Sequence, residues 1–310
     1  MDIEIITTEE LNPRSINIDI SSTEDILKII NNEDKTVAAT VEGQISKITE
    51  AVEIIYGRLK GNGRLFYVGC GTSGRIGILD ASECPPTYGT DPEMVQGIIA
   101  GGQTAITTAV EGVEDDYNSG ILDISEKNIK QDDVIVGITA SGRAAYVIGA
   151  LEYARKCGAA TIGISNAKDP LLRKYTDVSI EAVVGPEVIM GSTRMKAGTA
   201  EKMILNMIST SVMVKLGKVY QNLMVDLQPN NKKLKERTIR IVMLATNETR
   251  EVAEKYLEIS YGKPKVAIVA ILGKVDPEVA LKCINKSEGF VKKAVEMAKM
   301  IHHTKNDCKF

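Results

Sequence analysis

The stretch that decides the fold is Gly63–Tyr88, GRLFYVGCGTSGRIGILDASECPPTY. Leu65–Val68 is a short apolar run with aromatic and β-branched residues, which predicts a buried strand. The turn Gly69–Gly74 follows, and the apolar residues after it predict a helix that Pro85 and Pro86 must end. A strand, a glycine-rich turn and a helix start direct backbone N–H groups to one point, which favours an anion, most often phosphate.

A second turn of this kind, Thr139-Ala140-Ser141-Gly142, lies about seventy residues later, after the predicted strand Val134–Ile138. The carboxyl ends of parallel strands meet at one edge of a sheet, so the two turns can converge on a single phosphate. This pairing predicts a site for a phosphorylated metabolite. The candidate phosphate- and sugar-binding residues are Thr72, Ser73, Gly74, Thr139, Ser141 and Gly142.

The turn Gly69–Gly74 also fits the dinucleotide fingerprint G-x-G-x-x-G. That fingerprint requires an acidic residue about twenty positions further on, at the end of the second strand. Here Asp91 lies in a proline-rich loop before the strand expected at Met94–Ala100. A nicotinamide cofactor is therefore disfavoured, and a turn that serves only close packing of strand and helix stays an alternative.

Strands alternate with helices along the first two thirds of the chain, which predicts an α/β fold with one parallel sheet covered on both faces. The further expected strands are Ala159–Ile164 and Val178–Val184. A helix starts at Ser21–Thr23, and the apolar spacing from Val37 to Leu59 predicts one long helix. Another helix is expected over Asp115–Lys130, and a long one closes the segment Gly185–Lys218. Ser192 and Thr193 are candidate caps of that long helix, with a substrate contact as the alternative.

The last part of the chain reads as a small helical domain. Helices are expected at Lys232–Leu244, Val252–Ser260, Asp276–Cys283 and Gly289–Met300, after a turn at residues 225–231. Lys265–Leu272 is apolar enough for a strand or a buried helix, and the sequence leaves that choice open. We therefore expect a catalytic domain with a helical N-terminal arm over residues 1–230 and a helical domain over residues 231–310.

Composition excludes several classes of function. The formal net charge of −3 argues against a nucleic-acid partner, which would require a basic surface. No apolar run is long enough to cross a membrane. The five cysteines are odd in number and form no C-x-x-C pair, which favours reduced thiols in the cytoplasm and disfavours a zinc site. Only His302 and His303 are histidines, so a general acid or base is expected to be a carboxylate.

Longer strings of sequence carry a family resemblance. The strings are LNPRSINID (residues 11–19), VGCGTSGRIGILDASECPPTYGT (68–90), AVEGVEDD (109–116) and GSTRMKAGTAEK (191–202). They resemble those of the N-acetylmuramic acid 6-phosphate etherases, and the two turns resemble the phosphosugar-binding loops of sugar isomerase domains. The resemblance implies the flavodoxin-like or Rossmann-like sugar isomerase fold and a homodimer whose subunits complete each other's sites.

The resemblance also implies a lyase of peptidoglycan recycling that removes D-lactate from the C3 ether of N-acetylmuramic acid 6-phosphate. Such an enzyme needs two carboxyl groups with opposite protonation states and no metal or redox cofactor. Glu83 in DASEC matches the family's acid, which protonates the departing lactate and later activates water. Glu114 in EGVED matches the second catalytic residue, to which we assign removal of the C2 proton, with Glu111 as a possible confounder.

Several alternatives stay open at this level. An aldose–ketose phosphosugar isomerase uses the same fold with an acid–base pair, and a phosphosugar-sensing regulatory protein shares related motifs. Countercharge for the phosphate is open as well, since a basic side chain near the turns is equally often structural. The candidate cations are Arg75, Arg143, Arg194 and Lys196.

Overall fold

The structure is a computed structural model that describes residues 7–227 and 232–307. The chain divides into two compact units. The first comprises the residues up to Ser82 together with Pro92–Thr210, and the second comprises Glu83–Asp91 and the residues from Ser211 onward. The expected functional division, a catalytic domain up to residue 230 and a helical domain beyond it, stays a prediction.

The first unit is built on a parallel sheet of five strands in the order β2-β1-β3-β4-β5. The strands are β1 (Leu65–Gly69), β2 (Val95–Ile99), β3 (Val134–Ile138), β4 (Ala160–Ser165) and β5 (Val178–Glu181). β1, β3 and β4 are buried along their whole length, as apolar strands of a doubly covered parallel sheet must be. All five strands were expected from the sequence, and so was their parallel pairing.

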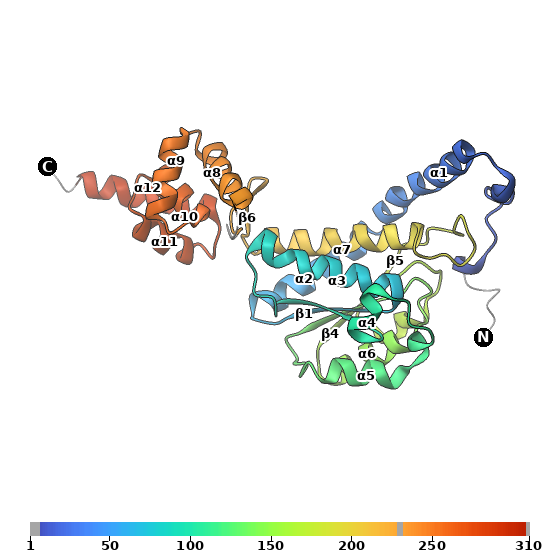
Figure 1. Ribbon diagram of the computed structural model, residues 1–310. Coiled ribbons are helices and arrows are strands. Elements are labelled where there is room, and N and C mark those ends of the chain that lie inside the picture. The colour runs from blue at the N-terminus through green and yellow to red at the C-terminus, as the bar shows by residue number, and fades with distance from the viewer. Residues whose placement is uncertain (1–6, 228–231, 308–310) are drawn as a thin grey trace. The chain divides into compact units, whose positions relative to one another are not determined.

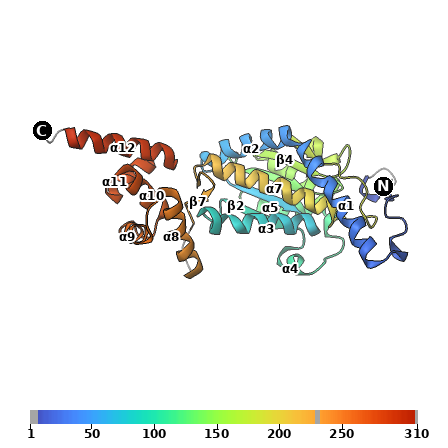
Figure 2. The same cartoon turned by 90° about the horizontal axis from the view of Figure 1, so that it is seen from above.

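Helices cover both faces of this sheet (Figure 1). On one face lie α2 (Ile45–Lys60), α3 (Gly71–Tyr88) and α7 (Lys196–Lys215), side by side in Figure 1 and in Figure 2. On the other face α5 (Tyr117–Ser125) and α6 (Ala145–Lys156) pack together on β1, β3 and β4. The short helix α4 (Gly102–Thr107) follows β2. The α/β class with a parallel sheet between helical layers is therefore confirmed.

The N-terminal helical region contains two helices where one was expected. α1 (Thr23–Glu42) ends at Gly43, and α2 begins at Ile45. The Ser22 hydroxyl caps α1 by accepting from the Asp25 N–H at 3.2 Å, as the sequence predicts. The apolar spacing continues through the break with the same helical phase, so the periodicity could not reveal the break. Glycine is common at helix C-termini, so Gly43 was the available signal. Figure 1 shows that α1 points away from the layers that cover the sheet.

The prolines at the end of α3 do not stop the helix where expected. α3 continues through Pro85 and Pro86 to Tyr88. The φ angle of proline matches the helical value, so the chain can stay helical through both prolines, at the cost of two N–H bonds and of crowding against the carbonyls one turn earlier. The helix ends at Gly89, whose φ is +61° and whose N–H donates to the Pro85 carbonyl at 2.9 Å. α5 is likewise shorter than the expected Asp115–Lys130, since Asp116 caps its start and the helix ends at Ser125.

In the part of the chain that the structure describes, the second unit contains a small hairpin and five helices besides the ends of α3 and α7. The hairpin pairs β6 (Val219–Tyr220) with β7 (Leu223–Met224). The helices are α8 (Lys232–Thr246), α9 (Arg250–Ile259), α10 (Pro264–Gly273), α11 (Pro277–Lys286) and α12 (Val291–Asp307). The ambiguous segment Lys265–Leu272 lies in α10, which is buried on most sides and therefore shows no amphipathic pattern. The turn expected at residues 225–231 lies partly outside the described residues.

An ion pair between Lys265 and Asp226 links α10 to the segment that follows the hairpin in the second unit. Lys265 Nζ donates to the Gly217 carbonyl at 3.0 Å and pairs with the Asp226 carboxylate. Close packing also requires glycine at position 89, because a Cβ there would lie 2.2 Å from the Asp226 carbonyl oxygen. Among the described residues, no helix is long and apolar enough to span a membrane.

Candidate active site

The two glycine-rich turns meet at one cavity at the carboxyl edge of the sheet. The cavity has a volume of about 260 Å³. Cys70–Ser73 line it after β1, and Ile138–Ser141 line it after β3. Because β1 and β3 are direct neighbours in the sheet, their turns open side by side. The convergence expected from the sequence is therefore present in the structure.

Five of the residues selected from the sequence line this cavity. They are Thr72, Ser73, Thr139, Ser141 and Glu114. Gly74 and Gly142 are not in the lining but shape the turns. A Cβ on Gly74 would lie 2.6 Å from Ile99 Cγ1 and 2.7 Å from the Gly69 carbonyl oxygen, so only glycine allows α3 to start this close to β1 and β2.

The second turn needs glycine for a related reason. Gly142 has a φ of +67°, and a Cβ there would lie 2.2 Å from Pro170 Cβ. This conformation holds the hydroxyls before it in place. Thr139 Oγ1 and Ser141 Oγ lie 3.3 Å apart, and the Arg143 N–H donates to Ser141 Oγ at 3.2 Å. The turn thus presents two ordered hydroxyls at the cavity.

Ser73, on the first turn of α3, has a buried carboxyl behind it. Its hydroxyl donates to Glu201 Oε1 at 2.9 Å. Glu201 lies on α7 and is only 1% exposed. Burial, together with the nearby charge of Glu187, raises the pKa of Glu201 to about 8, although the bond from Ser73 acts in the opposite direction.

The carboxylates selected as catalytic occupy different places. Glu114 is exposed and lines the cavity, whereas Glu111 is absent from the lining. Glu83 is exposed and is absent from the lining as well. α3 rises about 1.5 Å per residue, so about 15 Å of helix separates Ser73 at the cavity from Glu83.

None of the four candidate cations lines the cavity. Arg75 donates from Nε to the Ile106 carbonyl at 3.0 Å, which ties α3 to the end of α4. Lys196 is completely buried and pairs with Glu33 on α1 at 2.6 Å. Arg143 and Arg194 are also absent from the cavity lining. Within residues 7–227 and 232–307 the lining contains no lysine, arginine or histidine, so hydroxyls and backbone N–H groups face an anion there.

Comparison with known proteins identifies the family. The model of the glucokinase regulatory protein N-terminal SIS domain matches residues 47–155, and the SIS domain model matches residues 114–211. A curated protein of Clostridium acetobutylicum named N-acetylmuramic acid 6-phosphate etherase is 56% identical, over 95% of this chain and 98% of the relative. The chain belongs to the N-acetylmuramic acid 6-phosphate etherase family.

Two further members of the etherase family are similar over almost their whole length. The protein of Caldanaerobacter subterraneus subsp. tengcongensis is 52% identical over 97% of this chain and 98% of the relative. That of Clostridioides difficile is 52% identical over 95% of this chain and 97% of the relative. The family resemblance seen in the sequence strings is confirmed.

The start of α7 in this etherase family member is capped by a carboxylate. Glu187, which is fully buried, accepts from the N–H groups of Lys196 at 3.0 Å and Ala197 at 2.9 Å. These are among the N–H groups that a helix start leaves without a partner inside the helix. The expected hydroxyl caps Ser192 and Thr193 do not take this role. Thr193 instead lines the cavity.

Cys70 lies in the first turn but is not activated as a nucleophile. Burial raises the pKa of its thiol to about 12, and the charges of Glu114 and Asp115 act in the same direction. The thiolate is the reactive form of cysteine, so Cys70 stays a neutral lining residue.

Several lining residues are not among the candidates selected from the sequence. Thr8 and Glu9 reach the cavity from the 3₁₀ helix Thr7–Glu9, and Gly191 reaches it from the loop before α7. Glu9 is a second carboxylate in the lining. Glu9 approaches Gly191 closely, because a Cβ there would lie 3.0 Å from Glu9 Oε2. The Gly191 loop lies inside a string that we had quoted, but only the fold shows which of its residues face the cavity.

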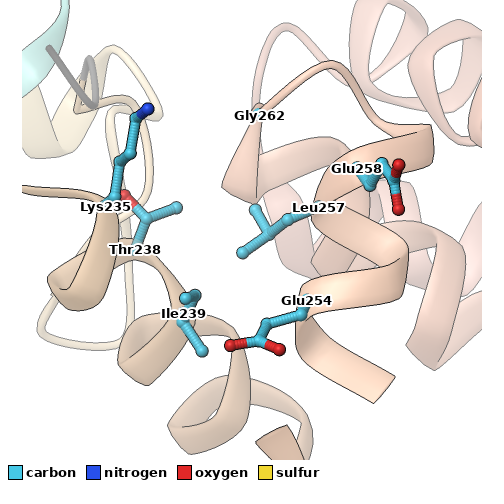
Figure 3. A pocket seen from close by; sticks show the side chains of 7 residues that line it. All are labelled: Lys235, Thr238, Ile239, Glu254, Leu257, Glu258 and Gly262. Carbon is cyan, nitrogen blue, oxygen red and sulfur yellow. The ribbon is translucent and has the colours of Figure 1, made fainter. Parts of the chain in front are cut away.

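A second cavity, in the helical unit, offers different chemistry (Figure 3). It measures about 240 Å³ and lies between α8 and α9. Ile239 and Leu257 face each other across it, with Glu254 at its edge. Glu254 pairs with Arg250 at 2.7 Å, one turn earlier on α9. This cavity has no glycine-rich turn and no helix start directed into it, so we do not assign it to the phosphosugar.

Proposed function

We propose that this protein is a carbon–oxygen lyase that cleaves the D-lactyl ether of N-acetylmuramic acid 6-phosphate to N-acetylglucosamine 6-phosphate and D-lactate. The observation that carries this proposal is the 56% identity to a relative of that name over almost the whole length of both chains. The cavity supports it, since two hydroxyl-bearing turns and a carboxylate meet there. An aldose–ketose isomerase and a regulatory sensor are less well supported, because the relatives share the etherase name.

The turns after β1 and β3 are proposed to hold the 6-phosphate. Thr72, Ser73, Thr139 and Ser141 bring hydroxyls to the cavity, and the start of α3 adds backbone N–H groups. A helix start carries a partial positive charge, which compensates for the missing cations in the lining. Gly74 and Gly142 give these turns their shape.

The reaction then requires an acid and a base at the sugar. In the open-chain form, the C1 aldehyde acidifies the C2 proton, and a carboxylate can remove it. The ether oxygen on C3 leaves as lactate once it is protonated, and water then adds to the unsaturated aldehyde at C3. We assign proton removal at C2 to Glu114, which lines the cavity. The acid that protonates the ether oxygen and later activates water is assigned to Glu83.

Glu83 is proposed to act in the site of a second copy of the chain. Its absence from the lining and the helical distance from Ser73 favour a donor on another subunit. Leu79, one turn before Glu83 on the same face of α3, is 54% exposed, as expected of a face that another chain covers. Exposed apolar residues also gather on the N-terminal arm and α1, namely Leu11, Ile16, Ile20 and Leu27. We therefore propose a homodimer with shared active sites.

We further propose that the enzyme works in the cytoplasm, in cell-wall amino-sugar recycling. Cys70, Cys157 and Cys283 form no disulfide. Reduced thiols are typical of a reducing compartment.

Isotope labelling tests the proposed mechanism directly. In H₂¹⁸O, elimination followed by water addition should place ¹⁸O at C3 of the N-acetylglucosamine 6-phosphate, besides any exchange of the C1 oxygen, and none on the D-lactate, because the bond from C3 to the ether oxygen breaks. In D₂O the product should carry deuterium at C2. Mass spectrometry measures both. Label in the lactate hydroxyl, or no deuterium at C2, would contradict the mechanism.

A further inference from the structure

Ser73 connects the cavity to a buried carboxyl that the proposed mechanism does not use. One side of Ser73 lines the cavity, and on the other its hydroxyl lies 2.9 Å from Glu201 Oε1. Ser73 is 7% exposed and Glu201 is 1% exposed, so water has little access to this contact. The two side chains come from α3 and α7, and the contact crosses between those helices.

The direction of this hydrogen bond matters for phosphate binding. A serine hydroxyl has one hydrogen to donate, and phosphate oxygens only accept. An ionised Glu201 also only accepts, so it takes the Ser73 hydrogen and leaves a lone pair facing the cavity. A protonated Glu201 can donate to Ser73 Oγ, and the serine hydrogen then turns toward the cavity.

We propose that Glu201 is a positioning residue and that the protein binds the phosphate while Glu201 is protonated. The Glu201 carboxyl then donates to Ser73 Oγ, and the Ser73 hydroxyl donates to the phosphate. The proton stays on Glu201, and only the hydroxyl hydrogen of Ser73 changes direction. Phosphate binding is therefore linked to the protonation of Glu201, and ionised Glu201 weakens binding through both the lost donor and like-charge repulsion. This inference rests on the phosphate site of the proposed function.

The surroundings of Glu201 favour the protonated form at neutral pH. Burial and the negative charge of Glu187 raise its pKa to about 8. The cation on the same helix, Lys196, is already paired with Glu33 of α1. On α3 the facing charged group is Asp80, which accepts hydrogen bonds from Asn206 and Ser209 farther along α7. No positive charge among these groups is paired with Glu201.

Binding of N-acetylglucosamine 6-phosphate, measured by calorimetry between pH 7.5 and 9.5, tests the proposal without any ether cleavage. The second pKa of a phosphate monoester is about 6, so the charge of the ligand stays constant over this range. For the wild type, we expect the dissociation constant to rise on the order of twentyfold across the range as Glu201 ionises. At pH 9 binding should also take up close to one proton, visible as a dependence of the heat on the buffer.

Two substitutions separate this linkage from a merely structural role. Glu201→Gln keeps a neutral donor at every pH, so its dissociation constant should stay near the neutral-pH wild-type value and change less than about twofold across the range. Asp80→Asn is the matched control, because Asp80 is a buried carboxyl between the same two helices, accepts from Asn206 and Ser209, and lies about two helical turns beyond Ser73 on α3. It should keep the wild-type pH dependence.

The outcomes are distinct. A wild-type dissociation constant that is independent of pH, with no proton uptake, would overturn the inference even if Glu201→Gln fails to fold. A wild-type slope that persists in Glu201→Gln would assign the titration to another group and overturn it as well. If the wild type binds no N-acetylglucosamine 6-phosphate at pH 7.5, the phosphate assignment itself falls, and this inference falls with it.

Discussion

Glu33 links the N-terminal arm and α1 to α7. It is 2% exposed, and its carboxylate accepts from Arg14 of the arm and from Lys196 of α7. The hydrogen bond from Arg14 is the largest cause that lowers the pKa of Glu33 from 4.5 to about 2, with Lys196 adding to it against the effect of burial. This stabilisation is therefore fully present above pH 4.5 and is lost as the pH falls toward 2.

Replacement of Glu33 by glutamine should destabilise the protein by about 3–5 kcal/mol at pH 7, because it leaves the buried charge of Lys196 unpaired. Urea unfolding measures this change. The difference from the wild type should shrink between pH 4.5 and 2, as the wild-type carboxylate becomes protonated. Glu50→Gln is the control, since Glu50 forms an exposed pair with Lys47 on α2 and should cost less than about 1 kcal/mol. Equal effects of the two substitutions would contradict this account.

Single residues were harder to predict than patterns. The turn hydroxyls Thr72, Ser73, Thr139 and Ser141 follow from the strand–turn–helix pattern, and the structure brings them to one cavity. Glu114 was selected through the family resemblance, and its catalytic role and that of Glu83 stay predictions. The buried carboxyls Glu33 and Glu201 carry no local signal, because their partners Lys196 and Ser73 lie on segments distant in sequence.

The turn after β1 is the element that places α3 at the cavity. Gly69 and Gly74 touch across it, since a Cβ on Gly69 would lie 2.7 Å from the Gly74 nitrogen. The backbone of the turn therefore packs directly on itself and on β2. The N–H groups at the start of α3 depend on this close approach.

Substitution of Gly74 by alanine should push α3 away from β2, at a cost of about 1–3 kcal/mol in the free energy of unfolding. We expect a weaker affinity for N-acetylglucosamine 6-phosphate as well. Gly57→Ala is the matched control, because no heavy atom lies within 4 Å of a Cβ there, in the middle of α2. It should stabilise the protein by about 0.5–1 kcal/mol. Thermal unfolding and calorimetric titration measure the two effects, and an unchanged affinity in Gly74→Ala would contradict the role of the turn.

Elements with strong local signals were predicted well. The strands at residues 65–69 and 134–138 are short apolar runs bounded by glycine or polar turns, and both are confirmed. Helix ends were predicted less well. The break at Gly43 interrupts a continuous apolar pattern, and α3 passes through Pro85 and Pro86 because their φ angles suit a helix. The buried helix α10 lacks the polar face that would have distinguished it from a strand.

At the scale of the whole molecule, the central question is whether two chains share each active site. If Glu83 and Glu114 act in the same site from different subunits, two inactive variants should restore each other's activity. Co-expression of Glu83→Gln with Glu114→Gln gives mixed dimers in which one site carries both substitutions and the other carries neither. Random assortment in a two-fold dimer then predicts about a quarter of the wild-type activity.

An inactive mixture would contradict the shared site. If both glutamates of a site come from one chain, every site in every mixed dimer carries one substitution, and the mixture stays as inactive as each variant alone. A sedimentation measurement must first show the dimer. A monomer with full activity would also contradict the shared site.

The central claim, that this chain is an etherase, is tested most directly by D-lactate release from N-acetylmuramic acid 6-phosphate by the purified protein. The account predicts one D-lactate for each N-acetylglucosamine 6-phosphate formed, with activity that survives EDTA and is lost in Glu83→Gln and Glu114→Gln. A protein that binds the phosphosugar and isomerises it, or leaves it intact without releasing lactate, would contradict the account.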